Sequence, residues 1–440
     1  MLPVDASQIT RRSFAKVGAL GFPAIVPHQV LGQQAPSNKL TVGFIGTGNN
    51  GTNWMRIFMR DKRVRVLAVC DVNREGGGYW DGSVRGREPA RRLVDEHYGD
   101  ASCLAFPDFR ELIERDDIDA IYIGTPDHWH ALMAIATARA GKHIFGQKPL
   151  SLTVREGRAM ADAVNTAGVV WQTGSQQRSD SHFRRVCEIA LSGRLGAIRT
   201  VRVGLPSGRP DYGRTAHLTE TEPVPDGFDY DMWLGPAPER PYAPARVGVN
   251  FRWVSDYSGG QVTDWGAHHL DIAQWGLGMD ASGPVAIKNA YGVFEEHPIY
   301  DTATEFRFEC EYQNGVRLVC STDERSGVRF EGRDGWAWAD RGTHEASARG
   351  LLTEPAGEGD IRLYRSEEHV TNFIDSCFSR EPTVAPIEAA HRSVTIAHLG
   401  NIALLTGRDL RWNPESERIV GDASADAMLG RPYRGTWSLP

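Results

Sequence analysis

The sequence predicts an α/β protein in which a doubly wound parallel sheet is followed by a second domain with an open antiparallel or mixed sheet. Short apolar strands alternate with helices between residues 39 and 165, and strands joined by turns prevail beyond them. The chain has 440 residues, of which 41% are apolar, so it is long enough to bury a core in each of two or three domains.

The elements of the first domain follow one another as strand and helix in turn. Buried parallel strands are short apolar runs, and such runs lie at 39–45, 64–70, 118–124 and 142–146. Helices are expected at 54–60, 129–140 and 153–165. The last helix starts with a capping box, Thr153 and Glu156, and stops before Gly168. This order predicts a parallel sheet with helices on both faces.

The second half of the chain has a different pattern. Strands are expected at 200–205, 286–294, 305–312 and 316–322. The intervening residues 206–262 are rich in proline, glycine and aromatic residues, and loops of that length usually carry function or hold subunits together. A late helix at 387–405 is expected to pack back on the first domain. The predicted division is therefore 1–37, 38–165, 166–385 and 386–440, the last being a helix and tail.

The first 37 residues resemble a twin-arginine export signal. Arg11 and Arg12 are followed by Phe14 and Lys16, then by a modestly apolar stretch, and processing is expected near Ala35. A disordered arm with two chance arginines is the alternative. The signal predicts a periplasmic or secreted protein that the twin-arginine machinery exports already folded.

Charge and hydropathy restrict the partners. The net charge of −7, with both signs interspersed, lacks the basic surface that nucleic acids require. No run approaches 18 consecutive apolar residues, so no integral membrane segment is expected. The cysteines have no zinc-type spacing, and no metal site is predicted. A small molecule is the expected partner.

A glycine-rich turn after the first strand indicates a dinucleotide site. Gly46 suits the tight turn, Gly48 the approach of a pyrophosphate, and Gly51 the packing of helix on strand. Asn49 and Asn50 lie in this turn, and the helix that follows it presents its positive end there. Together with an acid at the end of the second strand, this turn predicts a Rossmann domain.

The acid at the end of the second strand bears on the choice of cofactor. Asp71 is placed to bind the ribose hydroxyls of NAD and to repel the extra phosphate of NADP. Arg74 keeps NADP possible, because an arginine three residues on can bind that phosphate.

Several further motifs resemble the glucose-fructose oxidoreductase/inositol dehydrogenase (Gfo/Idh/MocA) family. They are the glycine turn, Asp71, and the stretches 125–130 (TPDHWH), 147–149 (QKP) and 264–271 (DWGAHHLD). The resemblance covers about residues 38–436 and is closest to exported branches of the family. It implies a Rossmann domain, a C-terminal α/β domain with a large open, mostly antiparallel sheet, and assembly into homodimers or tetramers. It also implies NAD(P)-dependent oxidation or reduction of a sugar, polyol or related compound.

The resemblance assigns roles to the edge of the first sheet. Lys148 matches the lysine that reaches substrate and nicotinamide ribose. Gln147 stands where the family usually has a glutamate, which removes a negative charge beside Lys148. Thr125, Pro126 and His130 follow the third strand at the carboxyl edge, where such folds bind ligands, and are assigned to the cofactor. The alternative for His130 is that it is only a polar residue at the start of a helix and has no part in binding.

Asp264 and His268 are the predicted proton-transfer pair. They are four residues apart, so they lie on one helical face, where the carboxylate can orient the imidazole and raise its basicity. In the family this pair carries proton abstraction, with Lys148 beside it. Asp271, on the same face, is expected to be a buried orienting carboxylate. A metal site at His268, His269 and Asp271 is disfavoured, because adjacent histidines diverge on a helix.

The substrate pocket is expected to contain aromatic and bidentate polar side chains, which suit the alternating C–H and hydroxyl surface of a sugar. The candidates are Trp129, Gln176, Gln177, Arg178, Tyr257 and His269. For His269, a purely structural role is equally open.

These observations predict an oxidoreductase with a tightly bound nicotinamide cofactor, since an exported enzyme has no pool of cofactor to exchange with. One alternative is a redox-neutral glycosidase or lyase that acts through a transient keto-sugar. Another is a sugar-binding protein that has lost catalysis, because Gln147 replaces the glutamate that the family usually has there.

Overall fold

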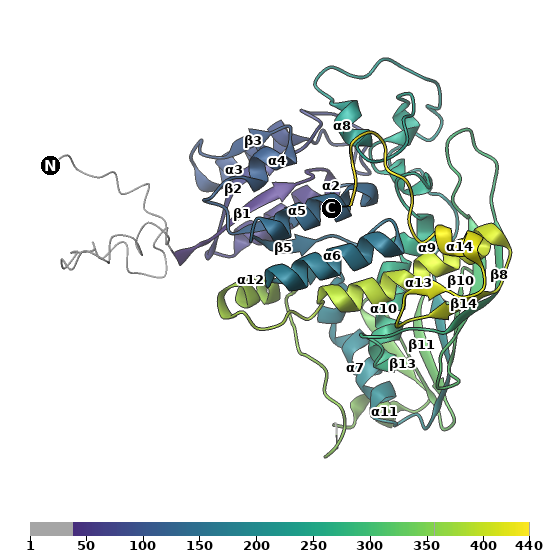
Figure 1. Cartoon of the computed structure of the whole chain (residues 1–440). Helices are drawn as coiled ribbons and strands as arrows, with labels where there is room; N and C mark the ends of the chain where they lie inside the picture. Colours follow the sequence, from purple (N-terminus) through teal and green to yellow (C-terminus); the bar gives the residue numbers. More distant parts are fainter. Residues whose placement is uncertain (1–37, 356, 440) are drawn as a thin grey trace, which may run out of the picture.

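The first sheet of the computed structural model, which describes residues 38–355 and 357–439, is parallel throughout (Figure 1). Its strand order is β3-β2-β1-β4-β5-β6, so the chain runs outward from β1 in both directions. The strands are β1 (Leu40–Ile45), β2 (Val64–Cys70), β3 (Leu104–Phe106), β4 (Ala120–Ile123), β5 (His143–Gly146) and β6 (Trp171–Thr173). This is the doubly wound arrangement that the sequence predicts.

Helices cover both faces of this sheet. One core, centred on Phe44 and Phe58, packs α2 (Asn49–Arg60) and α3 (Arg87–Tyr98) against the sheet. The opposite core packs α4 (Phe109–Ile113), α5 (Asp127–Arg139) and α6 (Val154–Ala167). Helix α6 has both hydrogen bonds of the Thr153–Glu156 capping box and ends at Gly168, as predicted.

The first sheet extends past the boundary predicted at residue 165, because β6 adds a strand beside β5. A later segment also joins this domain: α12 (His369–Ser379) places Phe373 5.5 Å from the ring of Phe145. The Rossmann core is therefore completed by a helix that lies about 200 residues further along the chain.

The second sheet has nine strands in the order β13-β12-β11-β7-β10-β9-β8-β14-β15. Only β7 and β10 pair in parallel; the other described neighbours are antiparallel, as predicted. The strands are β7 (Ile198–Gly204), β8 (Ala286–Val293), β9 (Glu305–Glu311), β10 (Arg317–Ser321), β11 (Gly327–Gly332), β12 (Trp336–Asp340), β13 (Thr343–Ala346), β14 (Leu410–Asn413) and β15 (Arg418–Ile419). Strands β11 to β13 were not predicted.

One face of the second sheet is covered by three helices, α7 (Ser181–Leu191), α10 (Gly266–Leu277) and α13 (Ile387–Thr406). Helix α13 also lies beside α6 of the first domain, as Figure 1 shows. The short helices α8 (Tyr230–Leu234), α9 (Gly260–Asp264), α11 (Arg349–Thr353) and α14 (Ala423–Ala427) lie in the connections.

The C-terminal tail runs from α14 back to the first domain (Figure 1). The Tyr433 hydroxyl donates to Glu156 at 2.7 Å, and the rings of Trp437 and Trp129 meet edge to face. No helix within 38–355 and 357–439 is long and apolar enough to cross a membrane. The predicted twin-arginine segment and its processing site lie outside the described residues.

Candidate active site

The glycine turn joins β1 to α2, and its glycines are sterically required. Gly46 has a φ of +84°, in the left-handed region that glycine favours. A Cβ at Gly51 would lie 1.9 Å from the Gly46 carbonyl oxygen. The backbone of β1 and α2 thus approaches too closely for any side chain, and the first N–H groups of α2 are left open at the turn.

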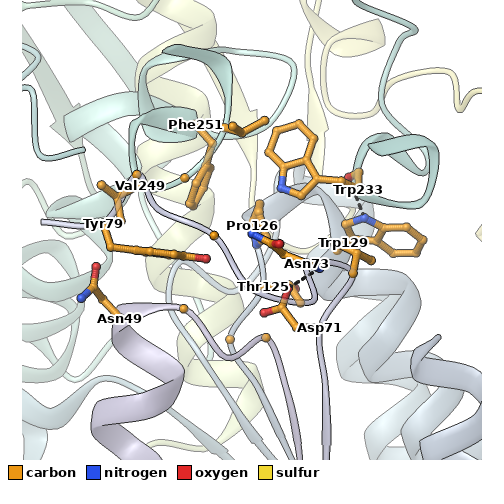
Figure 2. A pocket seen from close by; sticks show the side chains of 18 of the residues that line it. Asn49, Asp71, Asn73, Tyr79, Thr125, Pro126, Trp129, Trp233, Val249 and Phe251 are labelled. Carbon is orange, nitrogen blue, oxygen red and sulfur yellow. Dashed lines mark hydrogen bonds between the residues drawn. The ribbon is translucent and has the colours of Figure 1, made fainter. Parts of the chain in front are cut away.

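Asp71, at the end of β2, is fixed against this turn. One carboxylate oxygen accepts the Thr47 backbone N–H at 2.8 Å, and the other accepts the Asn73 N–H at 2.9 Å (Figure 2). Arg74 packs its side chain on Gly227 and is not part of the cavity lining. The acid therefore faces the cavity and the arginine does not, which is the arrangement suited to NAD.

A cavity opens above the turn at the carboxyl edge of the first sheet. Figure 2 shows Asn49, Asp71 and Thr125 on its sheet side and Tyr79, Val249, Phe251 and Trp233 opposite them. Of the predicted cofactor residues, the lining contains Gly46, Gly48, Asn49, Asn50, Asp71, Thr125, Pro126, Gln147 and Lys148. The loop residues on the far wall were missed, because loops without periodicity give no signal beyond their aromatic content.

Two loops that contribute to the cavity lining contact each other. The Val249 N–H donates to the Gly78 carbonyl at 3.1 Å, and the Arg74 N–H donates to the Gly227 carbonyl at 2.8 Å. Gly248 lies so close to Gly78 that an added Cβ would be 2.4 Å from the Gly78 oxygen. We call these contacts, between residues 72–86 and 206–262, the loop seam.

Three amides border the cavity. Asn50 donates to the Gln147 side-chain oxygen at 2.9 Å. The amide nitrogens of Asn49 and Gln147 are buried and have no partner in the described chain. An unpartnered buried donor is costly unless a ligand accepts from it. Together with Asp71 and the steric requirement at Gly51, these donors fit a dinucleotide, with its ribose and phosphate oxygens.

His130 does not reach the cavity, in contrast to the prediction. Its ring nitrogens lie 2.8 Å from the Pro149 carbonyl and 2.9 Å from the Thr125 carbonyl. It therefore links the two loops that carry Thr125 and Lys148. Trp129 does line the cavity, and its indole N–H donates to the Trp233 carbonyl at 3.0 Å.

Lys148 and Asp264 form the ionic centre of the site. The Lys148 Nζ lies 2.6 Å from Oδ1 of Asp264 and 3.1 Å from its backbone carbonyl. Arg252 Nε lies 3.3 Å from the same carboxylate oxygen. Burial opposes ionisation of Asp264, but the cations of Lys148 and Arg252 outweigh it and hold the pKa of this carboxyl well below its usual range.

Asp264 does not accept a hydrogen bond from the His268 ring, and this corrects the orienting role assigned to the acid. Nδ1 of His268 is buried and has no partner in the described chain. Asp264 ends α9 and His268 lies in the next helix, α10, while the Lys148 ammonium reaches the carboxylate directly. A full positive charge at 2.6 Å binds the carboxylate more strongly than a neutral imidazole does.

His268 is held uncharged. Burial, followed by the nearby cations of Lys148 and Arg341, lowers the pKa of its imidazole well below the usual value. Gln177, with its amide oriented to satisfy both neighbours, donates to the His268 backbone carbonyl at 3.1 Å and accepts from Arg341 Nε at 3.2 Å. The arrangement therefore offers a neutral imidazole, a proton acceptor, beside a lysine ammonium, a hydrogen-bond donor.

Three predicted substrate residues are structural instead. Arg178 is buried and binds Asp271 through Nε at 2.7 Å, so Asp271 orients an arginine and not His268. The His269 ring lies 2.9 Å from the Gly204 carbonyl. Tyr257 packs against Trp233 within a buried aromatic cluster. Sequence alone gave no sign of these distant partners. Gln176 is half-buried.

Comparisons with known proteins agree with this geometry. A family model described as an oxidoreductase NAD-binding Rossmann fold matches residues 40–175, and one described as an oxidoreductase C-terminal alpha/beta domain matches residues 186–439. The chain belongs to the Gfo/Idh/MocA oxidoreductase family. The predicted family and the NAD-binding Rossmann domain are thereby confirmed, while membership of an exported branch stays a prediction.

Two individual relatives resemble the chain over different shares of its length. Myo-inositol 2-dehydrogenase of Thermotoga maritima is 26% identical over 401 residues, which cover 87% of this chain and 98% of that protein. A glycosyl hydrolase family 109 protein of Shewanella sp. strain MR-4 is 37% identical over 134 residues, 30% of this chain and 27% of that protein.

Solved structures share the fold. Aldose-aldose oxidoreductase of Caulobacter crescentus superposes with a TM-score of 0.60 at 19% identity, over 85% of this chain and 99% of that one. The WlbA dehydrogenase of Bordetella pertussis, in complex with NADH and UDP-GlcNAcA, gives 0.60 at 16% identity, over 85% and 99%.

Proposed function

We propose that this protein is an NAD-dependent oxidoreductase that moves hydride between a hydroxyl-bearing carbon of a sugar, polyol or glycoside and a tightly held cofactor. The observation that carries the proposal is the uncharged His268 beside the Lys148–Asp264 pair, whose lysine lines a cavity suited to NAD. NAD, when bound, supplies the hydride acceptor and donor.

In the oxidation direction, each residue has a distinct task. His268, neutral and with a free Nδ1, accepts the proton of the substrate hydroxyl. Lys148 donates a hydrogen bond to the same oxygen and stabilises the negative charge that develops on it. Asp264 holds the Lys148 ammonium in position at 2.6 Å. Burial of this group of residues excludes water and strengthens these interactions.

The loop seam supports tight retention of the cofactor. Residues 206–262 form the outer wall of the cavity and are hydrogen-bonded to residues 72–86 across it. Departure of a dinucleotide requires this seam to part, which slows exchange.

The test combines cofactor analysis with substitution of the proposed base. We expect purified protein to release NAD on denaturation, and His268→Ala to lose about 100- to 10,000-fold in turnover while it keeps NAD. Full turnover in His268→Ala would contradict the assigned role.

A redox-neutral glycosidase is the second candidate. It is favoured by the glycosyl hydrolase family 109 relatives, one of which matches over 134 residues. In that case the oxidation is transient: the keto-sugar makes the adjacent C–H acidic, a glycosidic bond is eliminated, and the hydride returns after water adds. Release of aglycone from a glycoside without net NADH would favour this candidate over the first.

Export and assembly belong to the same proposal. We propose that residues 1–37 direct the folded, NAD-loaded protein through the twin-arginine route to the periplasm or beyond. Arg11→Lys with Arg12→Lys should then retain the protein in the cytoplasm, as measured by cell fractionation. Unchanged export of this variant would contradict the route.

We also propose that the protein forms a homodimer or tetramer through the helix-free face of the second sheet. That face carries ion pairs such as Arg202–Glu331 and Arg307–Glu309, together with exposed Tyr291. Light scattering should give a mass of two or four chains, and Arg202→Glu should lower it. A single-chain mass for the unmodified protein would contradict this.

A further inference from the structure

Arg341 lies in the turn between β12 and β13, beside His268. Its guanidinium stacks on the Trp265 ring at 4.6 Å from the centroid. Its Nε donates to Gln177, which in turn binds the His268 backbone carbonyl. A stacked and hydrogen-bonded guanidinium loses little further conformational freedom when it binds a ligand, so this side chain is preorganised next to the proposed base.

Unlike its neighbours in sequence, Arg341 has no carboxylate partner. The other three arginines between residues 325 and 341 are paired: Arg325 with Glu345 at 2.7 Å, Arg329 with Glu331 at 2.9 Å and Arg333 with Asp334 at 2.7 Å. Over residues 38–355 and 357–439, no carboxylate lies within ion-pair distance of Arg341, and its two Nη atoms donate no hydrogen bond. The fork of the guanidinium therefore has no partner among the described residues, and Arg341 is exposed.

Cations and carboxylates both surround His268, and the carboxylates of Asp340, Asp264 and Asp180 lie near enough to act on the charge of Arg341. Lys148 and Arg252 share the single carboxylate of Asp264, and Arg341 adds a third cation. Asp127 carries only part of a negative charge near pH 7, because burial raises the pKa of its carboxyl to about 7. The Asp340 carboxylate accepts the backbone N–H of Arg341 and does not bind its guanidinium.

We propose that Arg341 binds a carboxylate of the substrate, so that the molecule oxidised or reduced here is a sugar acid. A planar carboxylate matches a guanidinium fork with two parallel hydrogen bonds, and one free fork suits one negative charge. The inference rests on the proposed function and names the substrate class of that same site. It makes Arg341 a specificity-determining residue, with Gln177 as its support.

The test measures binding to the full-length, NAD-loaded protein by tryptophan fluorescence and calorimetry. The probes are a panel of hexuronates and aldonates, their neutral parent sugars, and the corresponding hexose phosphates. We expect at least one sugar acid to bind about 10-fold or more tightly than its neutral parent, the size of effect that a charge-assisted hydrogen bond gives. Arg341→Gln should abolish this difference, and Arg341→Lys should keep only part of it.

Arg325→Gln is the matched control. Arg325 stacks on a tryptophan too, 3.4 Å above Trp338, but it is already paired with Glu345 on the outer sheet. This variant should keep the preference for sugar acids.

Equal or weaker binding of every sugar acid relative to its parent, or an unchanged preference in Arg341→Gln, would overturn the inference. Tighter binding of the hexose phosphates would overturn the assignment to a carboxylate. If a neutral sugar reduces the bound NAD as well as any acid does, the proposed function stands and the inference fails. If sugar acids bind through Arg341 and no hydride moves, the inference stands and the proposed function fails.

Discussion

At the scale of single residues, the site depends on keeping one imidazole neutral among cations. His268 is buried and lies near Lys148 and Arg341, and both conditions disfavour its protonated form. A base of this kind is weaker than an ordinary histidine but remains available at acidic pH. Its proton-accepting role therefore shows most clearly in the dependence of turnover on pH.

The pH profile is the first prediction. Because the base acts in its neutral form and its pKa is lowered, turnover should stay constant as the pH falls through about 6.5, the usual histidine pKa, and decline only below it. Arg341→Gln removes one of the cations that lower this pKa, so the decline should move toward higher pH. The measurement is kcat against pH at saturating substrate; a decline centred at the usual pKa in the unmodified protein would contradict it.

The second prediction concerns Asp264. The sequence predicted that it orients His268, whereas in the structure it pairs with Lys148. Asp264→Asn removes the charge that holds Lys148 and leaves the Lys148 and Arg252 cations facing each other. Displacement of a catalytic group by about 1 Å costs on the order of 100-fold in rate, so kcat should fall by about that factor. NAD content should be unchanged.

Asp375→Asn is the control for this prediction. Asp375 also pairs with an arginine, Arg63, but at an exposed position. Exposed pairs contribute little, so this variant should retain its turnover. Equal rates for both variants would show that Asp264 does not position Lys148.

Among the elements, the loop seam determines how firmly the cavity holds the cofactor. Neither loop has a strand or long helix at the contact, so its hold on the cavity comes from backbone hydrogen bonds and close glycine packing. Such contacts tolerate no added side chain at Gly248, which gives a direct way to open the seam.

Gly248→Ala is the third prediction. The added methyl would lie 2.4 Å from the Gly78 carbonyl oxygen, so the two loops must move apart and bound NAD should dissociate faster. Gly407→Ala is a matched control, since both glycines have a φ of +62° and a Cβ at Gly407 meets nothing within 4 Å. Both variants place an alanine at a positive φ, but only Gly248→Ala brings the added methyl against the Gly78 carbonyl oxygen. Equal rates of NAD loss would contradict the role of the seam.

Several elements could be predicted because their signals are local. The strand β2 is a continuous apolar run, and α6 carries both its capping box and its terminal glycine. Strands β11 to β13 were missed because they lack a clear apolar pattern: β11 includes half-exposed Arg329, β12 begins with half-exposed Trp336, and β13 has no buried residue. Strand β3 was not predicted because it has only three residues.

The sequence identified most residues of the candidate site, but not the contacts between residues that are far apart in the chain. The glycine turn, Asp71, Lys148, Asp264 and His268 all follow from motifs. Which residue Asp264 binds does not, because Lys148 and Asp264 are 116 positions apart. The same holds for Arg178, whose buried partner Asp271 is 93 positions away.

At the scale of the whole molecule, the two domains are joined by an ionic cluster between α6, α13 and the β14–β15 turn. Arg158 binds both Glu388 and Glu417, and Glu417 also lies 3.0 Å from Nε2 of buried His391. The cleft between the domains holds the site, so this cluster helps to fix the distance between the Rossmann edge and His268.

The fourth prediction is that Glu417→Gln lowers stability by roughly 2 kcal/mol, the order of cost for removing one partner of a partly buried pair. Burial opposes ionisation of Glu417, but hydrogen bonds from His391 and Arg158 lower its pKa to about 2. Its contribution is thus complete above the unfolded value of 4.5 and is lost as the pH falls toward 2. Melting temperature against pH, in both proteins, measures it; equal melting at neutral pH would contradict it.

The most direct measurement for the whole account is an experimental structure of the protein with NAD bound. We predict that the nicotinamide ring faces Lys148 and the His268 imidazole across a space that admits one hydroxyl-bearing carbon. A nicotinamide ring turned away from these residues, or separated from His268 by other side chains, would contradict it.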